Sequence, residues 1–101
     1  MSRLNLYKNH LLELAASYPY LLDIQNDQLH AGTRIVTLVR KSGVVADISI
    51  TTLKFSYAGE PYSASLLDLL TVSERNLGAP LAQLDHLKAE LTNAVDFIFI
   101  D

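Results

Sequence analysis

The chain has 101 residues, half of them hydrophobic and 19% charged, a balance typical of a globular protein. The net charge of −3 disfavours direct nucleic-acid binding, and the absence of cysteine excludes disulfide and thiolate chemistry. No apolar run reaches the roughly 18 residues that a membrane span needs, and the first residues lack the layout of a signal peptide. We therefore expect a single domain over residues 1–101 in the cytoplasm.

The first half of the chain predicts short strands that are separated by turns. Residues 4–7 alternate between apolar and polar and indicate a strand, whereas residues 10–19 indicate a long loop that ends at a proline. Residues 20–24 form a second apolar strand candidate. The strongest strand candidate is residues 34–40, which are rich in β-branched side chains.

The next segments are less regular. Apolar residues alternate in two phases over residues 48–57, which predicts a bulge at Thr51 and Thr52. Residues 58–61 predict a hairpin loop. Leucines recur at helix-compatible spacing over residues 65–77, so the local pattern favours a helix there, with a strand as the alternative.

The C-terminal segment predicts an amphipathic helix, with Asp85 as its N-cap. Its last turn, residues 97–100, is apolar all round, and a helix that is apolar all round must be buried all round. We therefore expect this helix to pack on its own domain and against a second copy of the chain. The residues on its inner face are Leu84, Leu87, Leu91, Val95 and Ile98.

These elements together indicate an α+β protein of mainly β structure, a small barrel or sandwich followed by a helix. The sequence predicts no catalytic residue, no metal and no cofactor. His10, His30 and His86 share no ligand spacing, and the acidic residues are scattered. Asp23 lies between apolar strand residues, where a hydrogen-bonded carboxylate is the expected role.

Residues 20–27, YLLDIQND, are a strand candidate followed by turn residues. They are the most specific of several segments that resemble the CcdB family, the toxins of plasmid-type toxin–antitoxin pairs that poison DNA gyrase. The family's other segments are matched by Leu6-Tyr7-Lys8-Asn9, by Arg34-Ile35-Val36-Thr37-Leu38, by Asp68 and Val72, and by Gly78, Leu84, His86 and residues 93–97.

The resemblance implies an SH3-like β-barrel with a small extra sheet and a C-terminal helix. It also implies that residues 66–72 are extended, against the local helical pattern. The partners that it implies are a second copy of the chain, the gyrase A subunit and a CcdA-like antitoxin, with neither nucleic acid nor membrane bound directly.

The resemblance also implies roles for individual residues. Phe99, Ile100 and Asp101 fall at the gyrase-binding end of the family's helix, where Ile100 replaces a tryptophan and Asp101 a glycine. The dimer interface is expected at Val95, Ile98 and Phe99. Arg34, Arg40 and Lys41 are the nearest feature to a basic cluster. The first interpretation is ordinary edge charges, and the alternative is part of the surface that meets an acidic antitoxin tail.

Two alternatives stay open. The chain is either an active gyrase poison or a diverged homologue that only dimerises and binds an antitoxin-like partner. A third possibility, an RNA-cleaving toxin of the MazF kind, needs a basic groove, and the net charge of −3 argues against one.

Overall fold

The computed structural model describes residues 4–11, 13–25, 32–42 and 51–99. Short 3-10 turns follow the fifth strand, at Glu74–Asn76, and precede the helix, at Asp85–Leu87. The strands and the helix are β1 (Asn5–Lys8), β2 (Tyr20–Asp23), β3 (Thr33–Lys41), β4 (Thr52–Tyr57), β5 (Glu60–Ser73), β6 (Ala82–Gln83) and α1 (Lys88–Phe99).

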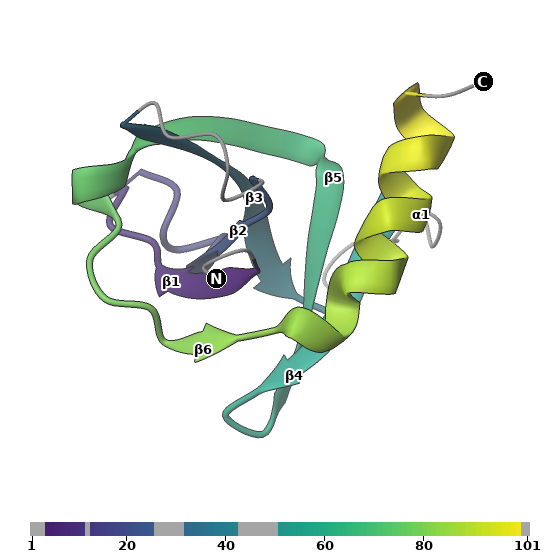
Figure 1. Cartoon of the computed structure of the whole chain (residues 1–101). Helices are drawn as coiled ribbons and strands as arrows, with labels where there is room; N and C mark the ends of the chain where they lie inside the picture. The colour runs from purple at the N-terminus through teal and green to yellow at the C-terminus, as the bar shows by residue number, and fades with distance from the viewer. Residues whose placement is uncertain (1–3, 12, 26–31, 43–50, 100–101) are drawn as a thin grey trace.

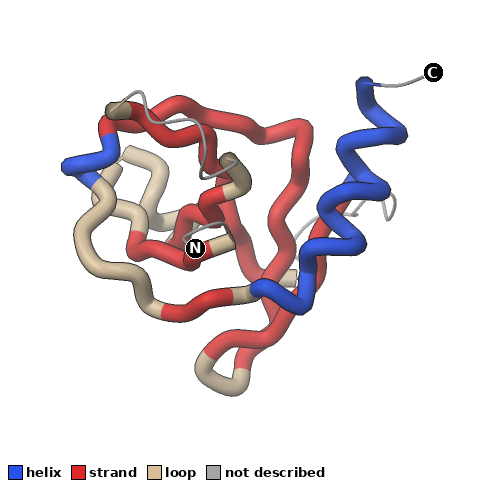
Figure 2. Tube along the Cα trace, viewed as in Figure 1, coloured by secondary structure: helices blue, strands red, loops and turns tan. Residues whose placement is uncertain are grey.

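The strands form one antiparallel sheet in the order β4-β5-β3-β2-β1-β6. The sheet curls into a half-barrel, and α1 stands beside it at the end of the chain (Figures 1 and 2). This architecture confirms the predicted mainly β fold with a barrel-like sheet and a C-terminal helix. The extra sheet is not separate among the described residues, since β4 and the first half of β5 continue the main sheet.

The long strand β5 changes direction in its middle (Figure 1). Between Thr37 and Val39, β3 advances by two residues while its partners on β5 run from Leu69 back to Ala64. The extra β5 residues form an irregular bend, which the hydroxyl of Thr37 stabilises by donating to the carbonyl oxygen of Ser65. Such bulges bend a strand and increase its local twist, and this one lets the sheet curl.

The bend also explains why the helix favoured by the local pattern over residues 65–77 is wrong. Because of strand alternation and the bend, the leucine side chains lie in different surroundings: Leu66 is buried, whereas Leu67 and Leu69 are exposed. The backbone N–H and C=O groups of β5 hydrogen-bond to β3 on one side and to β4 on the other. Tertiary pairing therefore overrides local propensity, and the extended structure implied by the family resemblance is confirmed.

The predicted bulge at Thr51 and Thr52 is not a feature of β4. This strand begins at Thr52 and pairs with β5 without a shift of register. The part of that prediction that concerns residues 48–50 lies outside the described residues.

The main hydrophobic core lies between the sheet and α1. Leu91 and Ala94 of α1 are fully buried, and they share a cluster with Leu53 and Phe55 of β4. The helical face predicted from periodicity is thus confirmed, with Val95 and Ile98 half-buried at its end. A second, smaller cluster is formed by Tyr7, Leu21, Val36 and Leu77.

The start of the terminal helix differs from the prediction. The N-cap position is Leu84, and no side chain caps it, whereas Asp85 is the first residue of the 3-10 turn. The turn leads directly into α1 at Lys88. The prediction that Asp85 caps the helix is therefore wrong, although Asp85 places a negative charge in the first turn of the 3-10 segment that leads into α1.

The β4–β5 hairpin contains an exposed residue at which a substitution should raise stability. Its two turn residues, Ala58 and Gly59, have φ angles of 53° and 81°, as a type I′ turn requires. The loop is therefore shorter than the predicted residues 58–61, because Glu60 and Pro61 already belong to β5.

We expect Ala58→Asn to raise the free energy of unfolding by about 1 kcal/mol, since a positive φ costs alanine more than asparagine. Urea unfolding followed by circular dichroism measures this change. Ala79→Asn is the matched control, because Ala79 is exposed and its φ is not positive. An equal gain at both positions would contradict this explanation.

Candidate functional site

The C-terminal half of α1 leaves apolar surface on its outer side. Phe97 is 56% exposed, while Val95 and Ile98 are half-buried against the chain's own core. The backbone of Phe99 ends the helix. The side chain of Phe99 and all of Ile100 and Asp101 lie outside what the structure describes, so the predicted gyrase-binding tip stays a prediction.

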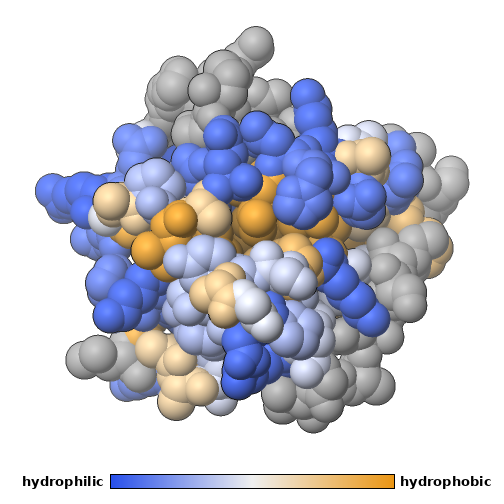
Figure 3. Space-filling view, turned by 90° about the horizontal axis from the view of Figure 1, so that it is seen from below, coloured by the Kyte–Doolittle hydropathy of each residue, from blue (hydrophilic) through white to orange (hydrophobic). Residues whose placement is uncertain are grey.

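The curled sheet also exposes large apolar side chains. Leu67 is 60% exposed, and Ile35 and Leu69 are each about 40% exposed. Thr37 pairs with Leu69 and Ile35 with Thr71, so Ile35 and Leu69 lie diagonally on one face of the β3–β5 pair. Hydrophobic side chains also form a band between hydrophilic ones on the lower face of the molecule (Figure 3). Exposed apolar patches of this kind are typical of protein interfaces.

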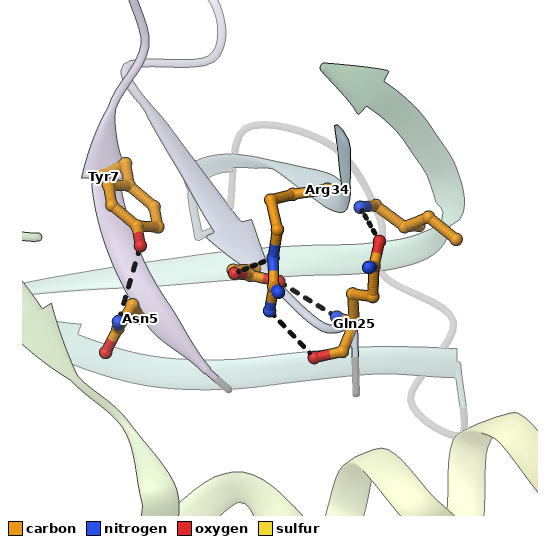
Figure 4. A network of polar contacts seen from close by, with 6 residues as sticks. Asn5, Tyr7, Gln25 and Arg34 are labelled. Atoms are coloured by element: carbon orange, nitrogen blue, oxygen red, sulfur yellow. Dashed lines mark hydrogen bonds and ion pairs between the residues drawn. The ribbon is translucent and has the colours of Figure 1, made fainter. Parts of the chain in front are cut away.

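Asp23 and Arg34 form a buried ion pair between β2 and β3 (Figure 4). Arg34 Nε lies 2.8 Å from Asp23 Oδ2, and the side chains are 4% and 1% exposed. The other carboxylate oxygen accepts from the backbone N–H of Gln25, and Arg34 Nη2 donates to the backbone carbonyl of Gln25 at 3.1 Å. Asp23 is thus the hydrogen-bonded carboxylate that the sequence predicted.

This network fixes the end of β2 against the start of β3. The side-chain oxygen of Gln25 accepts a hydrogen bond from the backbone N–H of Ile35 at 2.9 Å. Asp23, Gln25 and Arg34 are therefore linked to one another, and Gln25 also links them to the backbone of β3. Arg34 was predicted to be an antitoxin contact on the surface. Its guanidinium instead faces the interior, where it holds the two strands together, so its role in partner binding has no geometric support.

Arg40 and Lys41, at the end of β3, do lie at a cleft. The cleft has a volume of about 590 Å³, and its other lining residues are Ala16, Ser17, Tyr18, Pro19 and Tyr62. Arg40 Nη1 lies 3.8 Å from Asp68 Oδ2, and Lys41 Nζ lies 3.5 Å from Glu60 Oε1. The side chain of Arg40 is 11% exposed and that of Lys41 58%. Arg40 and Lys41 therefore line a cleft, whereas Arg34 belongs to the buried ion pair with Asp23.

Aromatic residues support the inner wall of this cleft. Tyr62 packs edge-on against Tyr20, with ring centroids 5.2 Å apart, and stacks on Phe55 at 6.1 Å. Partial burial raises the pKa of Tyr20, and its hydrogen bond and charge interaction with Tyr62 raise that pKa further. The phenol of Tyr20 is therefore uncharged at neutral pH.

A second cleft, of about 470 Å³, was not anticipated from the sequence. Its polar lining includes His10 and Asn76, and its apolar lining includes Leu11, Leu21 and Leu77. These residues come from the first loop, β2 and the turn after β5, so no local pattern could reveal the cleft. Within the described ranges, no three His, Cys, Asp or Glu residues gather as a metal site would need.

Among protein-family models, the one described as CcdB protein matches residues 3–100. The chain belongs to the CcdB family. No curated protein matches it. Membership of the CcdB family supports a role as the toxin of a toxin–antitoxin system, and the curled half-barrel with a terminal helix fits the CcdB fold. Of the helices described, none is long and apolar enough to cross a membrane.

Proposed function

We propose that the chain is a CcdB-type toxin that binds the A subunit of DNA gyrase and traps the cleaved gyrase–DNA complex. The observation that carries the proposal is the family match over residues 3–100. The exposed Phe97 near the end of α1 supports it, because it gives this end of the helix apolar surface for a partner. The mechanism is binding, not catalysis by this chain, and gyrase as the target places it in the cytoplasm.

Expression in a gyrase-dependent bacterium tests this proposal. We expect growth to stop and covalent gyrase–DNA complexes to accumulate. Normal growth at a high level of soluble protein would contradict the proposal.

A second candidate function is supported by the end of the sequence. Ile100 stands where the family has a tryptophan, and isoleucine lacks the aromatic face that attracts an arginine, a contribution of roughly 0.5–2 kcal/mol. On this alternative, the chain dimerises and binds an antitoxin-like partner without poisoning gyrase. Changing Ile100 and Asp101 to tryptophan and glycine and adding an isoleucine distinguishes the two. Toxicity that appears only in this variant favours the alternative.

We further propose that the chain forms a homodimer through the C-terminal half of α1, at Val95, Ile98 and Phe99, with the exposed Phe97 contributing to the same interface. Sedimentation at low micromolar concentration should give about twice the chain's mass. Phe97→Ser should shift the protein toward the monomer without unfolding it, because this side chain is already 56% exposed.

The matched control for the dimer is Leu11→Ser, which removes a 40% exposed apolar side chain from the first loop. It should leave the mass unchanged. A monomeric wild-type protein, or an equal effect of both substitutions, would contradict the proposed interface.

A further inference from the structure

The base of the second cleft is formed by the smaller hydrophobic cluster. Leu21 and Leu77 belong to that cluster, line the cleft and are only 3% and 4% exposed. Leu70 and Val72 of β5 pack against the same cluster and line the cleft as well. These side chains come from β2, from β5 and from the end of the turn after β5, so the fold itself gives the cleft an apolar base.

Leu11 forms a wall of the second cleft, although its side chain is 40% exposed. Its backbone is fixed on both sides. The N–H of Leu11 donates to Oδ1 of the buried Asn9 at 2.9 Å, and its carbonyl oxygen accepts from the N–H groups of Leu14 and Ala15 at 2.9 and 3.0 Å. This wall therefore exists before a ligand binds, which lowers the entropic cost of binding.

Two polar side chains line the cleft from neighbouring loops. Asn76 belongs to the turn after β5, which the N–H of Leu77 closes by donating to the carbonyl of Glu74 at 3.2 Å. His10 belongs to the first loop, and its Nε2 lies 4.0 Å from the position that a Cβ on Gly78 would take, so the imidazole lies against the residues that follow the same turn. Both side chains can donate and accept hydrogen bonds.

The charge and the size of the second cleft restrict its ligand. Among the described residues that line it, there is no lysine, arginine, aspartate or glutamate. An ionised ligand would therefore lose water without meeting a fixed opposite charge, which is unfavourable. The volume of about 470 Å³ is roughly three times that of a ~150 Å³ cavity that binds benzene, so a molecule of one or two rings fits.

We propose that the second cleft binds a small, uncharged, mainly apolar molecule that carries one hydroxyl or a similar polar group. The apolar body lies on Leu21 and Leu77 and against Leu11, and the polar group hydrogen-bonds to His10 or Asn76. A preformed concave site with an apolar base and few polar groups is typical of small-molecule binding. None of the described lining residues belongs to α1, so the site is separate from the proposed gyrase contact.

Titration of the protein with 2-naphthol, a neutral alcohol of two rings, tests the proposal. Binding is followed by the NMR chemical shifts of the backbone amides. We expect saturable one-to-one binding with a dissociation constant on the order of 0.1 mM, and shifts that are concentrated at residues 10–11, 21 and 70–77. At pH 8, 2-naphthoate, which has the same rings and a carboxylate, should bind about tenfold more weakly.

Two substitutions place the binding in the cleft. Leu11→Ser should weaken binding about fivefold, because it removes an apolar wall. Leu81→Ser is its matched control, since Leu81 is 42% exposed and does not line the cleft. Val72→Phe should abolish binding by filling the cleft. Its control is Leu38→Phe, because Leu38 is half-buried against the same cluster but lies outside the lining.

Four results would overturn the proposal. The first is a set of shifts that do not saturate or that spread over the surface. The second is an equal effect of Leu11→Ser and Leu81→Ser, both of which change exposed side chains and should leave the protein folded. The third is binding of 2-naphthoate at least as tight as that of 2-naphthol. The fourth is an affinity that falls as the protein concentration rises, since a second copy of the chain would then fill the cleft.

Discussion

Replacing Asp23 by asparagine is expected to lower the free energy of unfolding by about 3–5 kcal/mol, because it leaves the buried guanidinium of Arg34 without its charged partner. The melting temperature should fall by roughly 15 °C or more. Urea and thermal unfolding of the purified variant measure both quantities. A variant that fails to fold agrees with the expected cost, whereas a loss below about 1 kcal/mol would contradict the role assigned to the pair.

Two comparisons make this test specific. Asp68→Asn removes the carboxylate of a longer, more exposed pair, and we expect a loss of at most about 1 kcal/mol. Replacing Asp23 by leucine and Arg34 by methionine together should cost less than either single change, since no charge is left buried. If the double substitution costs the sum of the two, the residues do not act as a pair.

Leu91→Ala is expected to cost about 2–5 kcal/mol, because this side chain is fully buried between α1 and the sheet and its removal leaves a cavity. Urea unfolding measures the loss. Thr92→Ala on the exposed side of the same helix is the control and should change stability by less than about 0.5 kcal/mol. Equal effects of the two would mean that α1 does not dock through Leu91.

The prediction also bears on function. The helix that Leu91 docks carries Phe97, so a detached helix would no longer present it in a fixed position. Growth arrest by the Leu91 variant should therefore fall together with its stability.

The sequence predicts those parts of the fold that depend on local periodicity. Residues 34–40 are rich in β-branched side chains and were assigned to the strand that became β3, and the spacing from Leu84 to Ile98 identified the buried face of α1. Residues 65–77 could not be assigned in this way, because the bend in β5 breaks strand alternation and makes the leucines look helical. Only the family resemblance identified that segment as extended.

The candidate site was predicted less well, for a related reason. Arg34 looks like an exposed strand residue because its partner, Asp23, lies on another strand and no local pattern links the two. The cleft joins Tyr18 of one loop to Lys41 and Tyr62 of two strands. Sites that are assembled by long-range pairing leave no spacing signal in the sequence.

The most direct test of the proposed function uses purified components. The chain is incubated with gyrase and supercoiled DNA, and the complex is then denatured and digested with protease. We expect linear DNA to accumulate with increasing protein and the gyrase A subunit to be retained on the immobilised chain. DNA that stays intact at saturating protein, with no retention of the A subunit, would contradict the proposal that this CcdB-family protein acts on gyrase.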